Sequence, residues 1–112
     1  MKNDQAHLNY ILDSIRKIEK YTSGIDEKSF KENELVQSGV LMQLTLIGEI
    51  SKKISDETKN KINIPWKDII GFRDRAIHNY FDMKVDVIWD TVQNDIPLLK
   101  KELSNNTRKS TD

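Results

Sequence analysis

The sequence predicts an all-α protein. Apolar residues recur at three- and four-residue spacings, and only 4 glycines and 2 prolines interrupt 112 residues. Alternating strand patterns are scarce. The length favours one domain, residues 1–103, followed by a polar tail, residues 104–112, that we expect to be disordered. Because so short a chain buries only a marginal core, self-association would add to its stability.

The first helix is predicted to start near Asp4, a residue type that caps helix N-termini. Its apolar residues fall on one stripe, with lysine and glutamate opposite. The stripe consists of Leu8, Ile11, Leu12, Ile15 and Ile18. The sequence TSG at residues 22–24 should end this helix, since glycine is common just beyond a helix C-terminus.

A second, more apolar helix is predicted over about residues 29–54. Its apolar surface is wider than one face, which is typical of a helix that packs on two sides. Gly39 and Gly48 would allow other helices to approach closely. Two interpretations stay open: a central core helix alone, or a core helix that also forms a dimer seam.

A polar connector, SDETKNKINIPW, leads to a third helix that begins at Pro65 and contains Trp66. Both Trp66 and Trp89 stand at helical positions typical of core residues. A fourth helix is predicted over about residues 85–103. Pro97 lies inside it and should kink it or shift its register.

Composition excludes several classes of protein. A net charge of zero excludes a strongly cationic nucleic-acid coat, although residues 59–84 carry a mild positive bias. The lack of cysteine excludes disulfides and thiolate zinc sites. The sequence contains no glycine-rich phosphate loop, so it does not support an ATP-binding fold. We expect no signal peptide, no membrane span and no cofactor, and therefore a cytoplasmic protein.

The stretch GFRDRAIHNYF, residues 71–81, places unusual polar chemistry on the third helix. Arg73 shares a mostly apolar stripe with Tyr80, so its guanidinium must reach a partner, a ligand or another chain. His78 lies about 140° further around the helix. The two side chains could meet only if the helix ends near His78 or a second copy supplies the other half of the site. Asp74, four residues before His78, could orient the imidazole.

Histidine transfers protons near neutral pH, and arginine binds phosphate through a charged fork. Together they suggest metal-independent cleavage of a phosphodiester, and the mechanism needs the 2′-OH of RNA. The spacing alone also fits a structural histidine among ordinary surface charges. With two histidines and no cysteine a histidine-based metal site is not favoured, while a carboxylate site for magnesium stays open.

The segment PWKDIIGFRDRAIHNYFDMKVDVIWDTVQNDIPLLKKEL, residues 65–103, resembles the HepT-like branch of the HEPN superfamily. LIGEISKKIS at residues 46–55 is similar to the central helix of that family, and YILDSIRKIEKY to its first helix. The likeness covers roughly residues 8–103. Asp74 stands where the family often has asparagine, and Ala76 where a larger aliphatic residue is more usual.

The resemblance implies a HEPN-like, antiparallel four- to five-helix up-and-down bundle that dimerises and brings two motifs into one cleft. It implies a ribonuclease toxin of a toxin–antitoxin pair, with Arg73 and His78 catalytic and Asp74 supporting them. The partner would be an MNT-type nucleotidyltransferase antitoxin that transfers AMP to Tyr80. The alternative is a non-catalytic helical module that binds a nucleotidyltransferase, a nucleotide or RNA.

Overall fold

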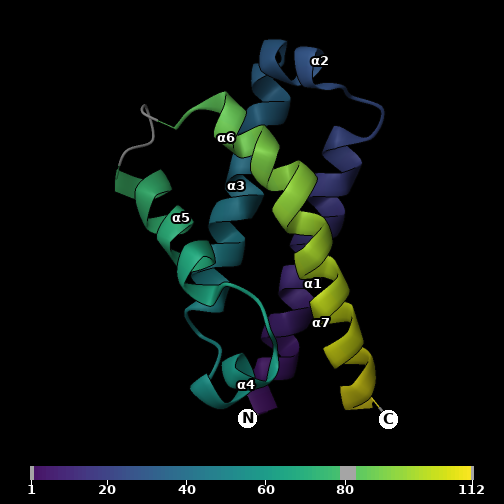
Figure 1. The fold of residues 1–112 in the computed structure, drawn as a ribbon, viewed down its shortest axis with the longest axis vertical. Coiled ribbons are helices and arrows are strands. Elements are labelled where there is room, and N and C mark those ends of the chain that lie inside the picture. The colour runs from purple at the N-terminus through teal and green to yellow at the C-terminus, as the bar shows by residue number, and fades with distance from the viewer. Residues whose placement is uncertain (1, 79–82, 112) are drawn as a thin grey trace.

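A computed structural model describes residues 2–78 and 83–111. All regular elements in these two ranges are helical, which confirms the all-α prediction. In chain order they are α1 (Lys2–Thr22), α2 (Glu27–Glu32), α3 (Glu34–Ser51), α4 (Asp56–Lys61), α5 (Trp66–His78), α6 (Val85–Asp90), a π-helical turn (Thr91–Asp95) and α7 (Ile96–Thr111). Four long segments, α1, α3, α5 and the joined α6–α7, run up and down in turn, with α2 and α4 at opposite ends (Figure 1).

Helix α1 buries the predicted stripe, and the chain then turns at Gly24, whose φ of 74° suits a residue without a side chain. The prediction that Asp4 caps this helix is wrong, because α1 already begins at Lys2. Asp4 is 5% exposed, and its hydrogen-bond partners lie on a distant part of the sequence. Its carboxylate accepts hydrogen bonds from the Ser55 backbone N–H (3.1 Å), the Ser55 hydroxyl and the Thr58 hydroxyl (2.6 Å). It therefore ties the start of α1 to the start of α4.

Burial alone would raise the pKa of Asp4, but the hydrogen bonds from Ser55 and Thr58 outweigh it and lower the pKa to about 2. The unfolded carboxyl titrates near pH 3.9, so its stabilising effect is complete above about pH 4 and fades as the pH falls towards 2. We expect Asp4→Asn to lower the free energy of unfolding at pH 7 by about 2 kcal/mol, with the difference shrinking in acid.

Urea denaturation of both proteins between pH 2 and pH 7 measures this difference. Asp13→Asn is the matched control, because the Asp13 side chain lies on the same helix, is 58% exposed and pairs only with Lys17 among the described residues. Its effect should stay within about 0.5 kcal/mol. Equal stability of the two variants at pH 7 would contradict the assigned role of Asp4.

The predicted second helix is in fact two helices, α2 and α3, separated at Asn33. Asn33 adopts an extended backbone, and its side-chain oxygen accepts a hydrogen bond from the Val36 N–H at 3.0 Å. Asparagine caps helices in this way and so competes with a continuous helix. Helix α3 packs on α1 and on α5, which confirms its two-sided packing. Gly39 faces the Tyr21 ring and Gly48 faces α5.

The last helical segment changes register before Pro97, as predicted. The N–H of Ile96 bonds to the Thr91 carbonyl, five residues back, and so forms a π-helical turn. Because Pro97 lacks an N–H, this turn accommodates it within a continuous segment. Helix α7 runs through Thr111, where we expected a disordered tail from residue 104. The Asn106 side chain donates to the Glu102 carbonyl at 2.8 Å within this stretch.

Both tryptophans lie in or against the core, as expected. Trp66 is buried and donates its indole N–H to the carbonyls of Lys59 and Ile62, while the Trp89 ring lies 5.0 Å from that of Phe30. These contacts anchor both ends of the segment that carries the polar motif. Over the described ranges, no helix is both long and apolar enough to cross a membrane.

Candidate functional site

Residues 71–78 of the polar motif lie on α5, which packs on α3 and buries Phe72 and Ala76. The two helices lie close together at Gly48. A side-chain carbon added there would overlap the Arg73 Cβ and lie 3.0 Å from the Ile69 carbonyl oxygen. Only glycine fits this contact without a shift of one helix. The close contact at Gly48 therefore sets the position of the Arg73 Cβ relative to α3.

Arg73 carries two ion pairs. Its Nη2 lies 2.5 Å from a Glu49 oxygen on α3, and its Nη1 donates to Asp74 at 2.8 Å. The side chain is only 19% exposed, and an unpaired charge would be costly there. Its pairing with Glu49 and Asp74 meets this requirement. The hydrogen bond from Arg73 holds the pKa of Asp74 below its usual value, and the Asp74 hydrogen bond raises the pKa of Arg73.

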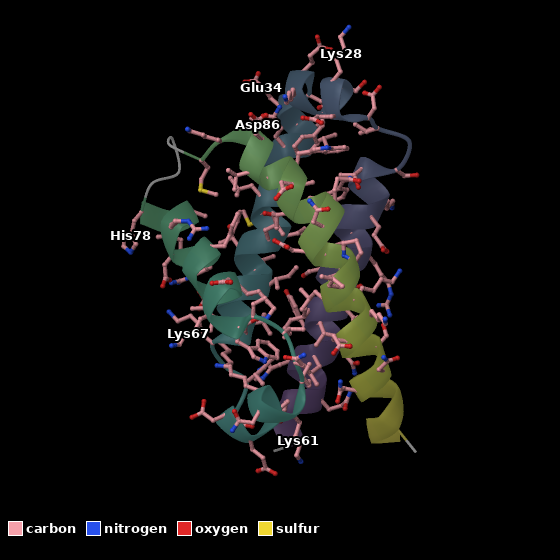
Figure 2. All side chains as sticks on the ribbon, in the orientation of Figure 1. Lys28, Glu34, Lys61, Lys67, His78 and Asp86 are labelled. Atoms are coloured by element: carbon pink, nitrogen blue, oxygen red, sulfur yellow. The ribbon has the colours of Figure 1, made fainter. Side chains whose placement is uncertain are left out.

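His78, the last described residue of α5, points away from the bundle (Figure 2). Its side chain is exposed, whereas Arg73 faces α3. One copy of the chain therefore separates the two groups, as the helical geometry predicts. Asp74 bonds to Arg73, and no hydrogen bond joins it to His78 in the part of the chain that the structure covers. Tyr80, the predicted modification target, lies outside the described residues.

The structure adds two residues that the sequence analysis did not place at the site. Glu49 pairs with Arg73 from α3, and Lys52, at the C-terminal cap of the same helix, lies close enough to Asp74 to lower its pKa further. Gly48 was the available signal, since a glycine that permits close helix approach also brings its neighbours to the other helix.

A groove of about 610 Å³ lies on another side of α5, between this helix and the α6–α7 segment. Its floor is apolar and includes Leu44, Ile47 and Phe72. Four carboxylates line it against two cationic side chains, namely Asp68, Asp90, Asp95 and Glu102 against Arg75 and Lys101. Partial burial raises the pKa of Asp95, and the carboxylates of Asp90 and Asp68 add to the effect. The excess of carboxylates makes this groove unfavourable for RNA phosphates.

The all-helical fold fits the HEPN class of nucleases, and the family match assigns the chain to it. The family described as "Ribonuclease HepT-like" matches residues 11–105. The chain belongs to this family, and its enzyme class is ribonuclease. Among the described residues, no group of three histidine or carboxylate side chains could hold a metal ion.

Curated relatives support this placement. The chain is 35% identical over 100 residues to a "Putative RNase" of Methanocaldococcus jannaschii, covering 88% of this chain and 92% of the relative. It is 37% identical over 100 residues to "Probable ribonuclease HepT" of Thermococcus cleftensis, covering 88% and 91%. A third relative, "Gamma-glutamylcyclotransferase and putative RNase" of M. jannaschii, is 38% identical over 103 residues, 91% of this chain but only 46% of that longer protein. No solved structure matches.

Proposed function

We propose that this protein is a metal-independent endoribonuclease whose site is assembled from two copies of the chain. The observation that carries the proposal is the opposed placement of Arg73 and His78 on α5. Arg73 is held against α3, and His78 is exposed and directed away from the bundle. In the proposed dimer the histidine of one copy meets the arginine of its partner, and two-fold symmetry repeats this contact to give two sites.

In the proposed reaction the ribose 2′-OH attacks the adjacent phosphorus, and the bond from phosphorus to the 5′ oxygen breaks. The products are a 2′,3′-cyclic phosphate and a 5′-OH end. His78 accepts the 2′-OH proton or gives a proton to the leaving oxygen. Arg73 stabilises the charge that grows on the non-bridging phosphate oxygens. In the free protein Asp74 accepts a hydrogen bond from the Arg73 guanidinium and so supports it before RNA binds.

We further propose that the enzyme is the toxin of a toxin–antitoxin pair, and that an MNT-type nucleotidyltransferase silences it by adding AMP to Tyr80. Tyr80 follows His78 by two residues in the sequence, so an attached group stays close to the histidine. AMP adds bulk and a negative phosphate, and like charge repels the phosphate of an RNA substrate. A modification at this position would therefore block the site without changing Arg73 or His78.

The test is an RNA cleavage assay in EDTA, before and after treatment with a candidate nucleotidyltransferase and ATP. We expect untreated protein to produce cyclic-phosphate ends, and treated protein to gain AMP on Tyr80 by mass spectrometry and to lose cleavage. Tyr80→Phe is the matched control, and it should cleave RNA both before and after treatment. Cleavage that disappears in EDTA contradicts the metal-independent mechanism, and an AMP-free Tyr80 contradicts the proposed regulation.

One observation favours a second candidate function, a non-catalytic module that binds a nucleotidyltransferase, a nucleotide or RNA. Two carboxylates, those of Glu49 and Asp74, already neutralise the Arg73 guanidinium. A cation that is fully paired has less capacity to attract phosphate. Tight binding of a nucleotidyltransferase by protein that cuts no RNA would favour this function over the nuclease.

A further inference from the structure

We propose that Glu49 is the positioning residue for Arg73, and that Asp74 is the carboxylate that an RNA phosphate displaces. The inference rests on the proposed nuclease function and assigns unequal roles to the two acids. Glu49 comes from α3, whereas Asp74 is the neighbour of Arg73 on α5. Glu49 therefore fixes the guanidinium relative to the rest of the fold, whereas Asp74 moves with the helix that carries Arg73.

The hydrogen atoms of the guanidinium decide how a phosphate can approach. The Nε atom of Arg73 is buried and has no hydrogen-bond partner within residues 2–78 and 83–111. The side-on approach, which needs Nε and one terminal nitrogen, is therefore closed to solvent. Nη1 donates a hydrogen bond to Asp74 and Nη2 forms an ion pair with Glu49, and each of these nitrogens carries two hydrogens, so a phosphate can still approach end-on to them. The Glu49 ion pair at Nη2 sets the direction of that end.

The charge at the site requires that one carboxylate leaves. Glu49 and Asp74 both pair with the Arg73 guanidinium, and Lys52 offsets only one of these two negative charges, so Arg73 can pair with a phosphate only after one carboxylate moves. Asp74 is the better candidate because its side chain is more exposed, 48% against 41% for Glu49. Lys52 lies near enough to stabilise the Asp74 carboxylate once it is released.

The test compares steady-state RNA cleavage by the parent protein, Glu49→Gln and Asp74→Asn. We expect Glu49→Gln to lower kcat by about 10- to 100-fold with little change in KM, since a misplaced catalytic group costs rate rather than binding. Asp74→Asn should lower KM, because a neutral side chain competes less with phosphate for Arg73. Glu19→Gln is the matched control: Glu19 pairs with Lys100 at a similar side-chain exposure, 45%, away from α5. It should leave both constants unchanged.

A second measurement separates positioning from a purely structural role. The Arg73 Nε–H signal in ¹⁵N NMR should be sharp and slow to exchange in the parent and in Glu19→Gln, and broadened in Glu49→Gln. Unchanged thermal stability of Glu49→Gln should accompany this loss of order. Parent-like kcat in Glu49→Gln overturns the inference, and so does a fall in kcat that only tracks a loss of folded protein.

The two proposals fail in different ways. If the parent cleaves no RNA under any condition, the nuclease function fails, and the NMR signal still reports whether Glu49 orders Arg73. If the parent cleaves RNA and Glu49→Gln leaves both kcat and the Nε–H signal unchanged, the role of Glu49 fails alone. An Asp74→Asn variant with a raised KM shows that Asp74 helps to bind the substrate and overturns its assignment as the displaced group.

Discussion

His78→Ala should lower RNA cleavage by about 10²- to 10⁴-fold, the range that a general acid–base contributes. The fold should be unaffected, because the side chain is exposed and directed away from the bundle. Lys67→Ala is the matched control, since Lys67 is also an exposed residue of α5 and lies near the opposite end of that helix from His78 (Figure 2). It should retain the parent rate. A His78→Ala protein that cuts RNA as fast as the parent contradicts the catalytic assignment.

Mixing inactive variants tests whether the site is shared between copies. In a dimer of one Arg73→Ala chain and one His78→Ala chain, a shared site can combine the intact Arg73 of one copy with the intact His78 of its partner. Random mixing makes half of the dimers mixed, each with one working site, so about a quarter of the parent activity should return. Within-chain sites would leave the mixture as inactive as each variant alone.

Gly48→Ala should lower both stability and activity. The added carbon would overlap the Arg73 Cβ, which is fixed to the backbone, and would press on the Ile69 carbonyl. Helix α5 must then move away from α3 at a cost of about 1–3 kcal/mol, partly offset by the roughly 1 kcal/mol that alanine gains over glycine in a helix. The shift also carries Arg73 away from Glu49, and a displacement of about 1 Å can reduce the rate about 10²-fold.

Gly39→Ala is the control for this substitution, because it makes the same change in the same helix. Its new carbon would lie 3.2 Å from the Tyr21 ring, a side chain that can shift slightly. We expect the stability of Gly39→Ala to stay within about 1 kcal/mol of the parent and its activity to be unchanged. Thermal unfolding and the cleavage assay read out both variants. Similar losses in Gly39→Ala and Gly48→Ala would contradict the special role of the contact at Gly48.

Periodicity predicted the helical class and the buried stripe of α1, because apolar spacing directly reports which face is covered. It did not find the break at Asn33, where a side-chain cap competes with the apolar pattern for the backbone. The cap prediction for Asp4, which rested on its residue type, was also wrong. Asp4 instead accepts hydrogen bonds from Ser55 and Thr58, and contacts between residues so far apart in the chain cannot be read from the local sequence.

The candidate site was predictable in part, to the extent that it depends on the geometry of one helix. Helical spacing placed Arg73 on the packed face and His78 well away from it, since both facts depend only on the geometry of one helix. The partner of Arg73 was not predictable, because Glu49 belongs to another helix and meets it only through tertiary packing. Asp74 was expected to orient His78. Its carboxylate instead accepts a hydrogen bond from Arg73, which is adjacent in the chain and carries a full positive charge.

The way α5 is attached has a consequence for local unfolding. The main packing partner of α5 is α3, and the 610 Å³ groove separates its other side from the α6–α7 segment. Cooperative units with few buried contacts open at lower free energy than the whole fold. The helix that carries Arg73 should thus exchange its amide hydrogens before α1 and α3 do. The proposed chemistry would then sit on the part of the bundle that can open while the core stays folded.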